Sequence, residues 1–366
     1  MANTNLSNAK KVKNDEFYTQ FSDIQKEIEA YLEFDPDVFR GKVVYSNCDD
    51  PFESNFFRYF ALNFNRLGLK RLITTSYKPS PIANTQLGLF GDDKTIKSAK
   101  GRTKITANKL IINEVHDMDG DGAFDLRDIA EQLKANRNNE WSPLEGDGDF
   151  RSPECEALLK QSDIVVTNPP FSLFRTYVAQ LVEYNKKFVI IGNLHAIVYK
   201  EIFPLIKADK MWLGNGFQAG NAYFSTPNVR EFAGGVYDEK TGLVKFRNCC
   251  WFTNLDHGRR HQPLSLMTIA DNLKFNKKMA GKTAYERYDN YDAIEVPFTD
   301  AIPSDYDGVM GVPVSFLDRY NPEQFQILGS NRGIDQDPDR VYGKGSYLNG
   351  KETFKRLFIR HRKPAA

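Results

Sequence analysis

The sequence is poor in cysteine, with four thiols at positions 48, 155, 249 and 250 among 366 residues. They form neither a Cys-x-x-Cys pair nor the spacing of a zinc site, and the adjacent pair has poor geometry for a disulfide. These absences argue against a disulfide-stabilised secreted domain and against a zinc-binding domain. We therefore expect reduced thiols in a protein of the cytoplasm.

Long hydrophobic runs and a net charge are missing as well. No apolar segment approaches the roughly 18 residues that a membrane-spanning helix needs, and the polar, basic N-terminus lacks the apolar core of a signal peptide. Lys and Arg number 49 against 48 Asp and Glu, so the formal net charge is only +1. A nucleic-acid-binding protein of this composition must concentrate its positive charge in local clusters.

Short apolar runs alternate with segments of helical spacing over the first two thirds of the chain. This alternation is typical of an α/β protein with a Rossmann-like, doubly wound parallel sheet. Strands are predicted at 42–45, 71–75, 163–167 and 187–192, and helices at 23–32, 54–64 and 174–184.

The alternating pattern ends near residue 260, where prolines, glycines and aromatic residues become interleaved and helices are hard to find. We expect one domain over residues 1–262 and a second region of mixed structure over 263–366. A polar, basic insert at about 78–109 interrupts the first domain. Segments of this length without regular structure are uncommon unless they are functional or disordered.

The predicted strand at 163–167 runs directly into Asn168-Pro169-Pro170-Phe171. Ligands of open parallel sheets bind at the carboxyl ends of the strands, and the two prolines restrict the backbone there. The Asn168 carbonyl and a proline carbonyl can accept hydrogen bonds from an aromatic amine and turn its lone pair toward an electrophilic methyl group. Phe171 can stack on the base. A rigid turn is the alternative interpretation, because Asn-Pro commonly begins a turn.

This loop resembles the Asp/Asn/Ser-Pro-Pro-aromatic motif of amino-methyltransferases. Three further segments, KNDEFYTQ, VVYSNCDDP and GDGDFRSPE, precede it in the order found in the EcoRI-type adenine-specific DNA methyltransferase family. The resemblance covers most of residues 10–260. It implies S-adenosylmethionine as the cofactor and Asn168, Pro169, Pro170 and Phe171 as the catalytic residues. The cofactor-binding residues that it implies are Asp15, Phe17, Tyr18, Thr19, Asn47, Asp49, Asp50, Asp149 and Phe150.

The turn after the first strand departs from the family pattern, because Glu53 and Asn55 stand where most methyltransferases have glycine. Glycine lets the backbone approach a ligand closely. Either the cofactor binds in a slightly different position in this chain, or Asn47, Asp49 and Asp50 contribute more of its binding.

The resemblance implies a bacterial enzyme that methylates adenine N6 at specific sites in double-stranded DNA, in restriction–modification or as a solitary methylase. We expect a monomer, located in the cytoplasm with the nucleoid, whose residues 263–366 recognise the target. Ser76 and Tyr77 occupy the place where an acidic residue usually binds the cofactor ribose. Two alternatives stay open: the same chemistry on RNA bases or a protein glutamine amide, and a catalytically silent DNA-binding or clamp-bound module.

Local basic clusters are the candidates for contacts with DNA phosphates. One lies in the insert, another at Arg259-Arg260 in a predicted hairpin, and a third near the C-terminus. Each is equally consistent with a solvated surface. The DNA-binding candidates are Lys97, Lys100, Arg102, Lys104, Arg259 and Arg260.

Two further motifs lie in the first domain. Gln86, Leu87, Leu89 and Phe90 resemble the peptide that binds the bacterial sliding clamp, although this segment could instead fold back on its own domain. Asp117, Asp119, Asp121 and Asp128 have nearly the spacing of a calcium-binding EF-hand loop. Asp128 replaces the usual bidentate Glu, so we favour an acidic turn and expect no metal.

Overall fold

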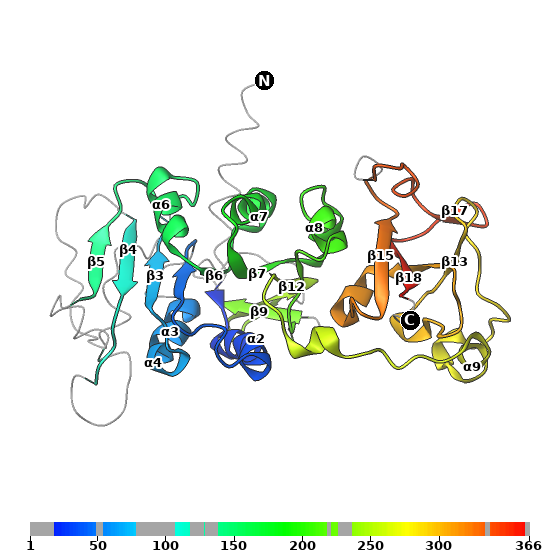
Figure 1. The fold of residues 1–366 in the computed structure, drawn as a ribbon, viewed down its shortest axis with the longest axis horizontal. Helices are drawn as coiled ribbons and strands as arrows, with labels where there is room; N and C mark the ends of the chain where they lie inside the picture. The colour runs from blue at the N-terminus through cyan, green and yellow to red at the C-terminus, as the bar shows by residue number, and fades with distance from the viewer. Residues whose placement is uncertain are drawn as a thin grey trace, which may run out of the picture. The chain divides into compact units, whose positions relative to one another are not determined.

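The computed structural model describes residues 18–48, 54–77, 107–117, 128, 138–217, 221–225, 236–333 and 337–362. The chain divides into two compact units. Unit 1 comprises residues 1–194 and 216–255, and unit 2 comprises residues 195–215 and 256–366. In Figure 1, unit 2 therefore contains the yellow-to-red part of the chain together with a short green segment.

The strands of unit 1 form a mixed sheet in the order β5-β4-β3-β2-β6-β7-β12. Its centre is parallel and matches the four predicted strands: β3 (Arg71–Thr75), β2 (Val43–Ser46), β6 (Ile164–Thr167) and β7 (Lys187–Asn193). The flanking strands are β4 (Asn108–Ile112), β5 (Glu140–Pro143) and β12 (Cys249–Thr253), and all three pair antiparallel. The expected α/β fold with a parallel centre is confirmed, and antiparallel strands extend that centre on both sides. Each of these three strands runs antiparallel to the strand with which it pairs.

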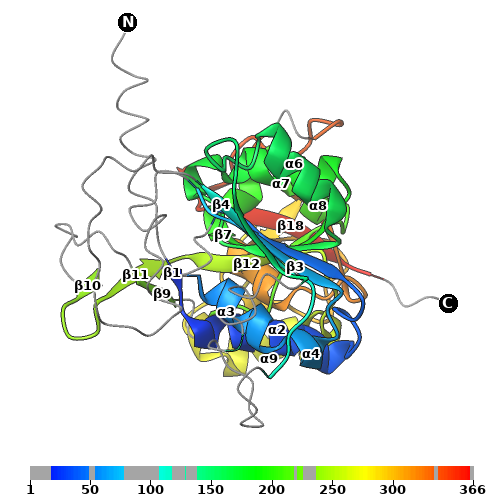
Figure 2. The same ribbon diagram turned by 90° about the vertical axis from the view of Figure 1, so that its left-hand side faces the viewer.

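Helices cover both faces of this sheet (Figure 2). On one side lie α2 (Phe21–Phe34), α3 (Asn55–Leu62) and α4 (Phe64–Leu67), and on the other lie α6 (Pro153–Gln161) and α7 (Phe174–Glu183). Alternate strand residues such as Val44, Leu72 and Val166 join α2 and α3 in one buried core. The period of two along a strand sends these side chains to the same face.

A second, antiparallel sheet of unit 1 has the order β1-β9-β11-β10. Its strands are β1 (Tyr18–Thr19), β9 (Asn221–Ser225), β11 (Leu243–Arg247) and β10 (Tyr237–Asp238). Tyr18 pairs with Ser225, so the N-terminal segment is held next to a strand that follows it by two hundred residues in the chain.

Unit 2 is built around the sheet β13-β14-β18-β15. Its strands are β13 (Ala293–Glu295), β14 (Val309–Pro313), β18 (Arg356–His361) and β15 (Phe325–Ser330). A small hairpin, β16 (Tyr347–Leu348) and β17 (Lys351–Glu352), precedes β18. The short helices α8 (Phe203–Lys207) and α9 (Ile269–Phe275) complete this mixed structure. Among the described residues no helix is long and apolar enough to cross a membrane.

Candidate active site

The order in which the chain adds strands to the sheet of unit 1 reverses at β2. The chain continues from β2 to β3 on one side and later places β6 on the other side. In open α/β sheets such a switch point creates a crevice at the carboxyl ends of the strands, where ligands bind. Asn47 directly follows β2 and Asn168 directly follows β6, so the topology brings two predicted site residues to this crevice.

Asn47 is fixed by partners from two other elements. The Tyr177 hydroxyl of α7 donates to Asn47 Oδ1, and the Thr167 hydroxyl at the end of β6 donates to the Asn47 carbonyl. Asn47, Thr167 and Tyr177 are all buried. The next residue, Cys48, has φ of 66°, a left-handed conformation that is rare for a non-glycine residue and typical of functional sites. Asn47 therefore shapes the crevice chiefly by holding the strand ends together.

The loop 168–171 packs against the rest of unit 1. Pro169 is buried, and so is the Oδ1 atom of Asn168. The Leu173 N–H donates to the Pro170 carbonyl at 2.9 Å, which forms the short 3-10 turn Phe171–Leu173 before α7 begins. Phe171 is half-buried against Phe246 of β11, with ring centroids 6.1 Å apart in an edge arrangement. The loop thus joins the sheet edge to the second sheet of unit 1.

The segment Asp147–Phe150 lies against the end of β3. Phe150 is buried with its ring edge-on to Tyr177 at 5.0 Å, and Gln180 Nε2 donates to the Phe150 carbonyl at 3.1 Å. Gly148 has φ of 79°, and a Cβ there would overlap the Ser76 carbonyl oxygen. Only glycine permits both this conformation and this approach. The packing explains why the Asp-Gly-Asp-Phe segment requires its glycine.

Charged groups gather beside this segment. Arg151 forms an ion pair with Asp149 at 2.5 Å, and its hydrogen bonds hold the pKa of Asp149 below the usual value. Burial, followed by the nearby Asp147 and Asp149, raises the pKa of Tyr77. Tyr77 therefore lies within electrostatic reach of both carboxylates. The Asp147–Asp149 segment thus brings two carboxylates close to the end of β3, where the chain itself has Ser76 and Tyr77.

The predicted cofactor-binding residues Tyr18 and Thr19 lie next to the start of α3. Asn55 Nδ2 donates to the Thr19 carbonyl at 2.7 Å, which ties β1 to the first residue of α3. This gives the non-glycine residue at position 55 a role that the sequence did not reveal. The Thr19 and Ser46 hydroxyls are buried and have no hydrogen-bond partner among the residues that the structure describes. Buried polar atoms near a turn of this kind suit a polar ligand such as the cofactor.

Several predicted residues lie outside the described part of the chain. Among the cofactor-binding residues these are Asp15, Phe17, Asp49 and Asp50. The insert residues Lys97, Lys100, Arg102 and Lys104, the clamp motif Gln86, Leu87, Leu89 and Phe90, and the calcium-like residues Asp119 and Asp121 also lie outside it. Within the described ranges no group of three or more acidic, His or Cys side chains is placed to hold a metal.

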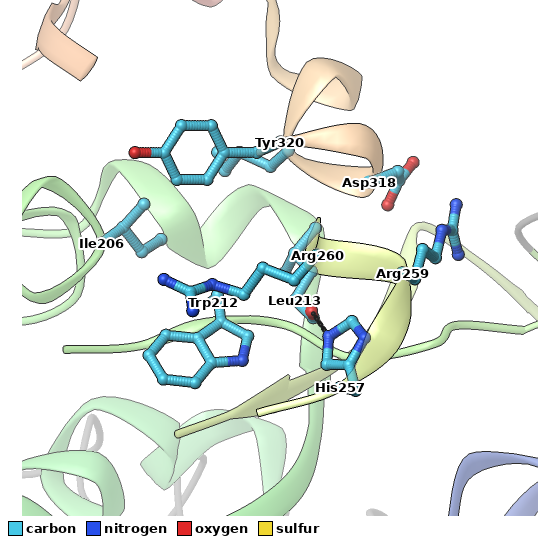
Figure 3. Close-up of a pocket in the computed structure, with 9 residues that line it drawn as sticks. Ile206, Trp212, Leu213, His257, Arg259, Arg260, Asp318 and Tyr320 are labelled. Carbon is cyan, nitrogen blue, oxygen red and sulfur yellow. Dashed lines mark hydrogen bonds between the residues drawn. The ribbon is translucent and has the colours of Figure 1, made fainter. Parts of the chain in front are cut away.

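The two predicted arginines of unit 2 have different surroundings. Residues 258–261 form a 3-10 turn, so the expected hairpin was wrong: the Arg260 N–H closes the turn on the His257 carbonyl at 3.1 Å. Figure 3 shows the Arg260 guanidinium over the ring of Trp212, 3.9 Å from its centroid, whereas Arg259 extends the other way. Arg260 also pairs with Asp209 and Asp256. Its charge is used inside the protein, which argues against a contact with DNA.

Arg259 instead faces a polar cleft of about 320 Å³ in unit 2. Asn215, Gln262 and Arg319 contribute its polar groups, and Pro263 and Leu264 line it as well. The Arg259 guanidinium donates to the Asn215 carbonyl. The Gln324 side chain fixes the backbone of Leu264, which lines the cleft. It accepts from the Leu264 N–H at 2.8 Å and donates to the Leu264 carbonyl at 3.0 Å. The cleft is thus a preformed site with two guanidinium groups.

The chain was compared with known proteins. The family model described as adenine-specific methyltransferase EcoRI matches residues 5–362. Type II methyltransferase M.EcoRI of Escherichia coli is 42% identical over 363 residues, which cover 98% of this chain and 96% of that protein. M.MpnI of Mycoplasma pneumoniae is 35% identical, and M.MgeORF184P of Mycoplasma genitalium is 32% identical; each alignment covers 88% of this chain and 84% or 85% of the relative. No solved structure matches the chain. The chain therefore belongs to the EcoRI family of adenine-specific methyltransferases, enzymes that methylate adenine in DNA with S-adenosylmethionine.

Proposed function

We propose that the crevice between β2 and β6 is the site of methyl transfer and that Asn168 directs it. The observation that carries this proposal is the position of Asn168 directly after β6 at the switch point, next to the anchored Asn47. The Asn168 carbonyl accepts a hydrogen bond from the target N6 amine. The Pro170 carbonyl already accepts from Leu173, so Pro169 supplies the second acceptor.

The two acceptors change the geometry of a weak nucleophile. The lone pair of adenine N6 is delocalised into the ring, and hydrogen bonds from its two hydrogens toward Asn168 and Pro169 favour a tetrahedral nitrogen. S-adenosylmethionine, when bound, would supply an electrophilic methyl group on a positively charged sulfonium, which is a good leaving group. Phe171 stacks on the base, and the amine releases its proton to solvent after transfer. No strong base is needed for this reaction.

The other site residues position the cofactor. Thr19 and Ser46 present buried hydroxyls near the turn after β2, and Asp149 and Phe150 lie beside Tyr77 at the end of β3. We assign the methionine part of the cofactor to the first group and its adenosine part to the second. The chemistry of each group supports this assignment. The hydroxyls can hydrogen-bond the charged ends of the methionine part, and an aromatic ring with carboxylates can bind a nucleoside.

The test is expression in a bacterial strain without adenine methylation, followed by sequencing that detects N6-methyladenine in genomic DNA. We expect methylation confined to one short sequence, which also reveals the recognition site. Methyl groups found in RNA or protein but absent from DNA would contradict the proposal. Because the relatives are named Type II methyltransferases, we propose a role in restriction–modification, carried out in the cytoplasm by a monomer.

The adjacent arginines of unit 2 provide a matched pair of variants for DNA binding. We propose that Arg259, with Arg319 in the same cleft, contacts a DNA phosphate. Arg259→Ala should reduce the salt dependence of DNA affinity by about one phosphate contact, a change of about 0.9 in the log–log slope. Fluorescence anisotropy of a labelled duplex across a salt series measures the slope.

Arg260→Ala is the control and should act on stability instead. It removes the arginine partner of Asp209 and Asp256, but Asp256 keeps His261 at 2.9 Å, and the two carboxylates are 42% and 41% exposed. Solvent screening therefore reduces the loss to about 2–3 kcal/mol, below that of a fully buried pair. Thermal unfolding measures it. An unchanged salt slope in Arg259→Ala would contradict the assignment of a phosphate contact.

The sliding-clamp motif stays a prediction. If Leu89 and Phe90 bind the clamp, purified clamp should retain the wild-type protein in a pull-down and release the variant in which both residues are alanine. Equal retention of the two proteins would exclude this motif as the contact. Ile82→Ala is the matched control, because it removes an apolar side chain from the same insert outside the motif.

A further inference from the structure

Phe354 is the most exposed large apolar side chain among the described residues, with 85% of its surface accessible. The three residues Leu357, Phe358 and Ile359 that follow shortly after it are completely buried. Leaving a phenyl ring in water forgoes the stabilisation that burial would supply. The ring stands in the connection between β17 and β18, where a polar residue would be the expected choice.

The backbone that carries Phe354 is held firmly. Asn331 is completely buried, and its Nδ2 donates to the Phe354 carbonyl at 2.8 Å while its Oδ1 accepts from the Arg356 N–H at 2.9 Å. The preceding Thr353 N–H donates to the Ser346 carbonyl at 2.7 Å. These contacts fix the backbone on both sides of Phe354, whose ring is exposed. Because this backbone is already ordered, less conformational entropy is lost when the ring inserts into a partner.

Positive charge surrounds this connection. Arg332 pairs at 2.6 Å with Glu352, which lies two residues before Phe354 in the chain. Lys355 directly follows Phe354. Burial, followed by the nearby Arg332, lowers the pKa of Lys355. Burial, followed by Lys355, lowers the pKa of His195. Lys355 and Arg332, the latter paired with Glu352, are therefore the two cations near Phe354 that a phosphate can contact.

We propose that Phe354 inserts its ring into the base stack of the bound DNA duplex, with Lys355 and Arg332 on the flanking phosphates. This inference rests on the DNA substrate of the family. Apolar side chains that enter a duplex unstack a base step, and cations next to them hold the backbone. An enzyme that must bring a base out of the helix gains from such unstacking. Phe354 is thus a positioning residue and takes no part in the chemistry.

The experiment uses the full chain and a labelled duplex that contains the sequence mapped by methylation. Phe354→Ala should weaken DNA binding about tenfold, within the range for one lost stacking contact, with an unchanged salt slope. Lys355→Gln should instead lower the slope by about 0.9. Phe354→Trp keeps a flat ring and should retain binding. Phe275→Ala is the matched control, because Phe275 is 61% exposed and also lies next to a lysine, Lys274.

A second readout reports unstacking directly. With 2-aminopurine in place of the target adenine, the wild-type protein should raise the fluorescence of the base on binding, and Phe354→Ala should reduce this rise. Equal affinity and fluorescence in the wild type, Phe354→Ala and Phe275→Ala would overturn the proposal. Loss of self-association in Phe354→Ala at unchanged DNA affinity would assign the ring to a second protein copy instead. Once the sequence is mapped with the wild-type protein, neither readout depends on methyl transfer by the variants, so failure of the proposal for Asn168 would be seen separately.

Discussion

Replacing Asn168 by alanine is expected to lower kcat for adenine methylation by about 10²–10³-fold, the scale for removing one preorganised hydrogen-bonding group from a transition state. The Asn168 carbonyl is the side-chain acceptor in our mechanism, and Pro169 alone cannot hold both amine hydrogens. The affinity for S-adenosylmethionine should change little, because the cofactor contacts are assigned to β1, β2 and the segment before α6. Single-turnover transfer of labelled methyl groups and calorimetric titration of the cofactor measure the two effects.

Asn168→Asp is the conservative control. It keeps an oxygen acceptor at the same distance along the side chain and should retain much more activity than Asn168→Ala. If the alanine variant methylates adenine at the wild-type rate, the loop is only a rigid turn. If the alanine and aspartate variants lose cofactor affinity equally, Asn168 belongs to the cofactor site instead.

Replacing Gly148 by alanine is expected to destabilise unit 1 by about 4 kcal/mol and to abolish cofactor binding. The methyl group would overlap the Ser76 carbonyl oxygen, and the residue would have to keep a φ of 79°. Both strain and overpacking carry costs of about 1–3 kcal/mol each. The loop must therefore move away from β3 and take Asp149 and Phe150 with it. Thermal unfolding and calorimetric titration with S-adenosylmethionine measure these changes.

Gly146→Ala is the matched control in the same segment. A Cβ at Gly146 meets no atom within 4 Å, so this variant should fold and bind the cofactor like the wild type. A Gly148→Ala protein with unchanged unfolding and cofactor affinity would show that the Asp147–Phe150 segment does not depend on its close approach to Ser76.

Much of unit 1 was predictable because its signals are local. The run KVVY is β-branched and aromatic, and the structure has a buried strand at Val43–Ser46. The prolines of Asn168–Phe171 restrict the backbone wherever they occur, so the stiff loop was predictable too. Unit 2 offered weaker signals, because its strands are short and separated by irregular turns. The chain segment 195–215 belongs to unit 2, and no local pattern marks it as an excursion.

The sequence by itself therefore determined the parallel centre of the sheet, the position of the Asn-Pro-Pro-Phe loop directly after β6 and the family with its cofactor. The tertiary structure alone decided which side chains support that loop: Tyr177 and Thr167 hold Asn47, and Asn55 holds Thr19. It also decided that Arg259 lines a cleft whereas Arg260 pairs with Asp209 over Trp212, and that Phe354 is exposed on a hydrogen-bonded backbone. The physical reason is the range of the interactions. Propensity and proline restraint act within a few residues, whereas these contacts join positions far apart in the chain and form only when the fold brings them together.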